Sequence, residues 1–177
     1  SYINKKFKID KIISFKGIKQ GIENTNYLLR SKNKKFILTI FEKRVSQNEI
    51  PFFMKLMDQL NNSKINCPKP QKNKNGNYLV RIKKKSACIV SFLEGKDKKL
   101  LNLKNCHEIG KMIAGMHLST KKINLSRKNS MSIKYLNPLL NSIKFKSKKF
   151  TNIEKFLKIN FKDIKMKWPK KLPSGII

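Results

Sequence analysis

The chain has 177 residues, 39% of them hydrophobic, which suffices for one average domain or two small lobes and excludes a chain disordered by composition. Its 42 basic and 10 acidic residues give a formal net charge of +32, which at first sight favours a polyanionic partner. Only 4 of these basic residues are arginine, the side chain on which most nucleic-acid-binding proteins depend for base recognition. We therefore interpret most of the charge as lysine side chains on solvent-exposed surfaces. A polyanion-binding site stays open as the alternative.

Cysteine usage and hydropathy indicate the compartment. Cys67, Cys88 and Cys106 are odd in number and form no Cys-x-x-Cys pair, which indicates a reducing compartment rather than a disulfide framework or zinc site. The longest nearly apolar run, residues 87–93, falls far short of the roughly 18 residues that cross a membrane. We therefore expect a cytoplasmic protein with no membrane partner and no metal site of its own.

The first third of the chain has the pattern of β-strands. Apolar residues cluster at 12–15, 27–29 and 36–41 and are separated by polar turns. In the third strand, alternation places Phe36, Leu38 and Ile40 on one face and the residues between them on the other. The first two strands are joined by residues 17–26, where two glycines and several amides suit a turn that presents backbone N–H groups.

A helix and further strands are predicted next. Apolar residues recur with helical spacing over 50–60, with Asn48 as the expected N-cap and Pro51 tolerated in the first turn. Asn75-Gly76 predicts a hairpin between residues 69–74 and 78–82. A nearly continuous apolar strand, 86–93, then ends at Glu94-Gly95.

Helical patterns dominate the rest of the chain. We expect helices over 103–119 and 151–168, and a short one near 136–143. The order indicates an α+β bilobal architecture, with an N-terminal lobe at 1–91, a hinge at 92–95 and a helical lobe at 96–177. A cleft between such lobes is a common place for a ligand.

A series of segments carries a resemblance to a known family. In chain order these are Phe15-Lys16-Gly17-Ile18, residues 21–29 (Gly-Ile-Glu-Asn-Thr-Asn-Tyr-Leu-Leu), 36–44, 50–57, Cys67-Pro68-x-Pro70, 89–95, Cys106-x-x-x-Gly110 with His117-Leu118, and 168–177. With these residues the chain resembles homoserine kinases of the aminoglycoside-phosphotransferase-like type. The resemblance covers nearly the whole chain, and residues 21–27 are its most particular part.

The resemblance implies a protein-kinase-like fold that transfers the γ-phosphoryl group of ATP, with Mg²⁺, to the hydroxyl of L-homoserine, a step toward threonine. It implies that residues 21–26 cover the phosphates, that the third strand contacts them and that the backbone at 91–94 receives the adenine. The expected nucleotide-binding residues are Gly21, Glu23, Asn24, Thr25, Asn26, Thr39, Ser91, Phe92 and Glu94.

Two departures from the kinase pattern follow from the same resemblance. Thr39 stands where protein kinases keep a lysine, so Lys43 or Arg44 is the expected phosphate contact, supported by Glu49. The family's catalytic His-x-Asp and its metal-binding Asp would follow Ile177 directly, so no catalytic or metal residue is assigned to this chain. We expect a truncated chain, inactive alone and with an unstable C-terminal half.

Two other functions remain as alternatives. Kinases of the same fold act on choline, methylthioribose or aminoglycosides, and most of the acceptor site is expected outside this chain. A small basic nucleic-acid-binding protein is the alternative from another class. The scattered arginines and the aromatic residues gathered in apolar stripes argue against a specific nucleic-acid partner.

Overall fold

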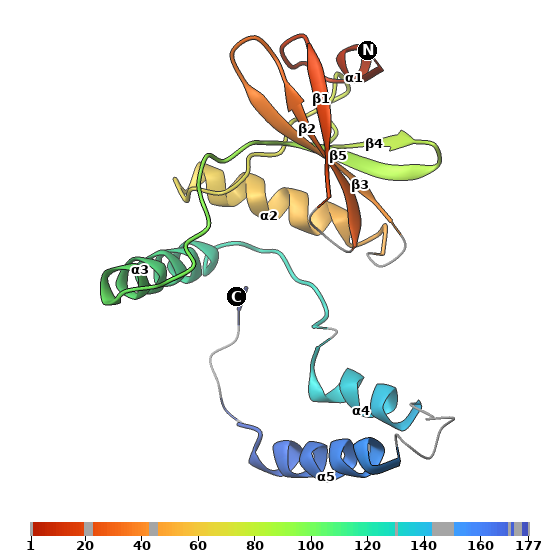
Figure 1. Ribbon diagram of the computed structural model, residues 1–177, viewed down its shortest axis with the longest axis vertical. Helices are drawn as coiled ribbons and strands as arrows, with labels where there is room; N and C mark the ends of the chain where they lie inside the picture. The colour runs from red at the N-terminus through yellow and green to blue at the C-terminus, as the bar shows by residue number, and fades with distance from the viewer. Residues whose placement is uncertain are drawn as a thin grey trace. The chain divides into compact units, whose positions relative to one another are not determined.

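The computed structural model describes residues 2–19, 23–42, 46–129, 131–142, 151–169, 171 and 175–176. The chain divides into two compact units, Ser1–Ser126 with Gly175–Ile177, and Arg127–Ser174. The first unit contains an antiparallel sheet and helices, so the α+β class is confirmed (Figure 1). The predicted lobe boundaries around residues 92–95 stay a prediction.

One five-stranded sheet forms the centre of the first unit (Figure 1). Its strands are β1 (Ser14–Ile18), β2 (Asn24–Arg30), β3 (Lys35–Phe41), β4 (Leu79–Ile82) and β5 (Lys85–Ser91). The spatial order is β1-β2-β3-β5-β4, and every neighbouring pair is antiparallel. The predicted strand regions at 27–29 and 36–41 lie within β2 and β3.

The two faces of the sheet carry separate cores, as the alternation in β3 predicts. Phe36 and Leu38 are buried with Leu29 and Ile89 and with Phe7, which follows the short helix α1 (Tyr2–Lys6). On the other face, buried residues of helix α2 (Ile50–Asn62) pack against β5; the buried members of this cluster are Ile50, Met54 and Cys88. We call these the α1 face and the α2 face.

The strand and hairpin predicted around Asn75-Gly76 are partly wrong. The turn exists, with Gly76 at φ +80°, but residues 69–74 form two isolated bridges, from Pro70 to Val90 and from Asn73 to Phe7, and no strand. The Gln71 N–H donates to the Ile89 carbonyl and the Ser91 N–H to the Lys69 carbonyl, so this segment pairs briefly with β5 rather than with β4. The actual hairpin joins β4 to β5 through Lys83 and Lys84, both at positive φ.

The helix predicted over 50–60 is confirmed as α2, but its N-cap is wrong. Glu49, not Asn48, occupies the cap position, with helical backbone angles and no side-chain capping bond. Helix α3 (Leu103–Thr120) has a reciprocal capping box between Asn102 and Asn105, and it contacts α2 in the same unit. The predicted helix over 103–119 is thereby confirmed.

The second unit contains α4 (Ile133–Ser142) and α5 (Thr151–Lys167) in its described part. Both correspond to predicted helices, although α4 begins three residues earlier than expected and contains Pro138. Helix α5 carries the ion pairs Glu154–Lys158 and Asp163–Lys167, each four residues apart, on its exposed surface. Among the described residues, no helix has the length and hydropathy needed to span a membrane.

Candidate functional site

A row of polar side chains crosses the α2 face from β2 to β5. Asn26, Thr39 and Cys88 are direct cross-strand partners, and partners of this kind point to the same face of a sheet. The Thr39 hydroxyl donates a hydrogen bond to the side-chain oxygen of Asn26 at 2.8 Å. This bond fixes the orientation of the Asn26 side-chain amide. Its NH₂ group is then the donor that an anionic oxygen of a ligand could accept from.

Cys88 is the buried, apolar member of this row, and its side chain packs against α2. Its side chain is 2% exposed and packs with Ile50 and Met54 of α2. Burial raises the pKa of the Cys88 thiol to about 12, although a hydrogen bond with the Thr39 backbone acts in the opposite direction. The thiol therefore stays protonated at neutral pH and serves as a packed apolar group.

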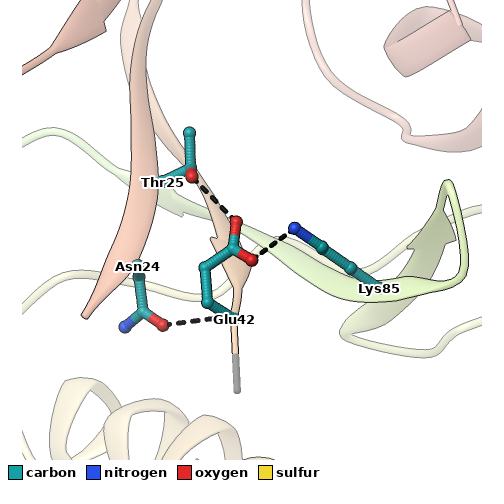
Figure 2. Close-up of polar contacts among 4 residues, drawn as sticks. All are labelled: Asn24, Thr25, Glu42 and Lys85. Carbon is teal, nitrogen blue, oxygen red and sulfur yellow. Dashed lines mark hydrogen bonds and ion pairs between the residues drawn. The ribbon is translucent and has the colours of Figure 1, made fainter. Parts of the chain in front are cut away.

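A second polar cluster lies at the same end of the sheet, on the α1 face (Figure 2). Glu42 follows β3, and its carboxylate accepts from the Thr25 hydroxyl at 2.9 Å and from the Lys85 ammonium group. The Glu42 N–H donates to the Asn24 side-chain oxygen at 3.4 Å. These contacts link the start of β2, the end of β3 and the start of β5.

The bonds from Lys85 and Thr25 hold the pKa of Glu42 below its ordinary value, with the Lys85 bond as the larger cause. Glu42 is therefore ionised at neutral pH and neutralises one lysine of a strongly basic surface. The carboxylate is partly exposed, so its role is to fix strand ends rather than to supply a large share of stability.

The predicted hinge continues from β5 and has only some of its backbone donors available. The Ser91 N–H donates to the Lys69 carbonyl at 2.9 Å, and the Phe92 N–H donates to the Lys35 carbonyl at 3.2 Å. Within the described part of the chain, the N–H groups of Leu93 and Glu94 have no such acceptor. A planar ligand at the hinge would therefore meet these two donors first.

The structure brings together only part of the predicted set. Asn24, Asn26 and Thr39 share the α2 face, whereas Thr25 lies on the α1 face and is bound to Glu42. Ser91 ends β5, and Phe92 and Glu94 follow it in the segment predicted as the hinge. Gly21, Lys43 and Arg44 fall outside the described residues. Glu23 precedes β2 and has an interaction of its own, and Glu49 is half-buried at the start of α2, also with a partner.

Three charged residues near these positions were not predicted. Glu42 and Lys85 lie in different strands 43 residues apart, and Lys35 meets Glu94 across 59 residues. Strand alternation places Lys35 on the same face as Thr39, two pleats away, but its partner follows only from the pairing of β3 with β5. No local motif signals either pair.

The described residues do not assemble a metal centre. No three His, Cys, Asp or Glu side chains converge within that part of the chain. The family resemblance assigns no Mg²⁺ ligand to these residues, and no step below is assigned to a metal ion.

Comparison with known proteins decides the family. The model of the phosphotransferase enzyme family matches residues 14–143, which cover the sheet, the hinge and α2 to α4. The chain belongs to this family.

Three curated relatives of this family member are homoserine kinases. The homoserine kinases of Parvibaculum lavamentivorans and Paramagnetospirillum magneticum are 34% and 36% identical to it over 97% of its length. The homoserine kinase of Agrobacterium fabrum is 34% identical over the same share. The matched regions are 54%, 53% and 53% of those proteins, so the chain spans about half the length of the curated relatives it matches.

Solved structures confirm the kinase-like fold of this family member. Spectinomycin phosphotransferase in its AMP-bound complex superimposes with a TM-score of 0.63 at 17% identity, over 98% of this chain and 58% of that one. A microcompartment-associated aminopropanol kinase gives 0.61 at 14% identity, over 78% and 47%. At these identities the likeness concerns the fold alone.

Proposed function

We propose that the complete protein transfers the γ-phosphoryl group of ATP to the hydroxyl of L-homoserine and forms O-phospho-L-homoserine, a step of threonine biosynthesis. The observation that carries the proposal is the 34–36% identity to homoserine kinases along 97% of the chain. A spectinomycin phosphotransferase of the same fold was solved with ADP, which supports a nucleotide as the donor.

We place the nucleotide along the α2 face of β3. Lys35 at the hinge end and Thr39 are four residues apart on one strand, about 13 Å at the usual rise, which is a span on the scale of an extended nucleotide. The base would meet the Leu93 and Glu94 N–H groups at the hinge end. The phosphates would meet the Asn26 NH₂ group at the other end, because the Thr39 hydroxyl already donates to the Asn26 side-chain oxygen and leaves that NH₂ group as the donor.

The remaining assigned residues belong to the same proposal. Gly21, Glu23, Asn24 and Thr25 are assigned to the segment over the phosphates, with the Thr25 side chain holding this segment from the opposite face through Glu42. Lys43 or Arg44 is assigned to a phosphate contact, and Glu49 to its support. Ser91 and Phe92 shape the backbone of the hinge, since their N–H groups already donate to the carbonyls of Lys69 and Lys35. No catalytic base and no Mg²⁺ ligand is assigned to the described residues.

The acceptor is tested with the product of the complete gene. ADP release is measured with homoserine, choline, methylthioribose and spectinomycin as acceptors, and the phosphorylated product is identified by mass spectrometry. We expect turnover with homoserine alone. Turnover with one of the other acceptors and not with homoserine would retain the kinase and overturn the substrate.

The nucleotide position is tested by a matched pair of variants. Asn26→Ala removes a donor from the α2 face, and Thr25→Val removes a hydroxyl one residue earlier on the opposite face. If the phosphates lie on the α2 face, Asn26→Ala raises the KM for ATP several-fold more than Thr25→Val does. An equal or reversed effect would move the phosphates to the α1 face.

A further inference from the structure

Lys35 makes three separate contacts with the hinge. Its ammonium nitrogen lies 2.6 Å from Glu94 Oε1 and 5.3 Å from the centroid of the Phe92 ring. Its backbone carbonyl accepts the Phe92 N–H at 3.2 Å. Lys35, at the start of β3, therefore contacts Phe92 through both its main chain and its side chain, and Glu94 through its side chain.

These contacts fix the backbone between their ends. Phe92 is held at its N–H and at its ring, and Glu94 is held at its carboxylate, so Leu93 lies between two anchored residues. The N–H groups of Leu93 and Glu94 are the first available hinge donors, and a hydrogen bond weakens steeply when its donor is misdirected. The orientation of these donors therefore depends on Lys35.

The position of Lys35 separates this role from phosphate binding. Lys35 and Thr39 point to the same face of β3, but about 13 Å of strand lies between them. Its ammonium group is already paired with a carboxylate and placed over a ring. A lysine in this position acts on the base end of a nucleotide and not on its transferred phosphoryl group.

We propose that Lys35 is a positioning residue that sets the affinity for the purine nucleotide by holding the hinge through Glu94 and Phe92. The inference rests on the proposed nucleotide site and adds a residue to it. The side chains of Lys35 and Glu94 are 38% and 75% exposed, so the ion pair is screened by solvent and the effect is moderate.

The test uses the product of the complete gene and a neighbouring lysine as the control. Lys35→Met removes the ammonium group, and Lys34→Met makes the same charge change one residue earlier, where the interactions recorded for Lys34 come from its backbone. Lys35→Arg keeps the charge, and Glu94→Gln removes the partner. ADP affinity, the KM for ATP, kcat and amide exchange of the hinge are measured for each.

We expect about three- to tenfold weaker ADP binding and a matching rise in the KM for ATP with Lys35→Met, while kcat stays unchanged. Lys34→Met leaves all values at wild type, Lys35→Arg restores most of the affinity, and Lys35→Met with Glu94→Gln is no weaker than Lys35→Met alone. Hinge amides exchange faster in Lys35→Met and, through loss of the same ion pair, in Glu94→Gln, whereas Lys34→Met leaves their exchange at the wild-type rate.

Three outcomes overturn the inference in distinguishable ways. Equal affinities of Lys35→Met and Lys34→Met, with wild type still binding ADP, refute the role of Lys35 and leave the nucleotide site intact. A fall in kcat without a rise in KM places Lys35 in the phosphoryl-transfer step instead. Absence of ADP binding by the wild-type protein refutes both this inference and the proposed function.

Discussion

Ile50 is the residue through which α2 is anchored to the sheet beneath the candidate site. It is fully buried at the first position of α2 and packs with Met54 and Cys88. Cys88 is in turn the cross-strand partner of Thr39. Replacing Ile50 by alanine removes three carbon atoms from this contact and leaves the backbone of the helix start unchanged.

The expected loss follows from burial and from the cavity that remains. Three buried carbons contribute about 2.4 kcal/mol at ~0.8 kcal/mol each. Incomplete collapse of the cavity brings the total to about 3 kcal/mol, within the range of about 2–5 kcal/mol for large-to-alanine changes in cores. Ile50→Val removes one carbon and should cost about 1 kcal/mol.

Amide hydrogen exchange measures this loss within the sheet. The free energy of opening is obtained for peptides that cover β3 and β5 in wild type, in both Ile50 variants and in Ile13→Ala. Ile13 is 67% exposed, so its truncation serves as a size-matched control with an effect near zero. A loss below about 1 kcal/mol for Ile50→Ala, or an equal loss for Ile13→Ala, would refute the packing of α2 against β5.

Three further predictions concern groups away from the hinge. Cys88 is buried with its pKa raised to about 12, whereas Cys106 is exposed, so a thiol reagent should label Cys106 and spare Cys88 in the native protein; equal labelling rates would contradict this burial. Burial, with the hydrogen bond to Asp58, raises the pKa of Tyr78 from 10.0 to about 12. Its contribution to stability is therefore complete below pH 10 and is lost as the pH rises toward 12, and Tyr78→Phe should remove that part of the pH dependence of urea unfolding. Lys83 and Lys84 have positive φ angles of 45° and 67°, which asparagine and glycine adopt with less backbone strain. The double change Lys83→Asn with Lys84→Gly should therefore raise the free energy of unfolding by about 1 kcal/mol, relative to the same changes at residues 98–99.

Strand periodicity predicted the local structure of the sheet well. In β3, Phe36 and Leu38 are buried together on one face, because a period of two assigns faces as soon as one strand is recognised. The N-cap of α2 and the segment at 69–74 were predicted less well. At 69–74, short pairing with β5 outweighed the local propensity for a hairpin with the strand after Asn75-Gly76.

The candidate site was likewise predicted in part from the sequence and decided in part by the tertiary structure. The resemblance selected β2, Thr39 and the hinge, and the pairing register then placed Asn26 beside Thr39 and placed Thr25 on the opposite face. Alternation alone puts Asn26 and Thr25 on opposite faces of β2, but it leaves open which of these faces receives α2 and which residue of β3 lies beside each. Register and helix placement together decide it.

The amino-acid sequence by itself determined the fold class, the order of most elements and the family, because these depend on periodicity and on motifs that are continuous in the chain. Only the tertiary structure decided which charged groups meet. The pairs Lys35–Glu94 and Glu42–Lys85 join residues 59 and 43 positions apart. In a chain with 38 lysines and 10 acidic residues, each carboxylate has many possible partners, and the sheet order selects one of them.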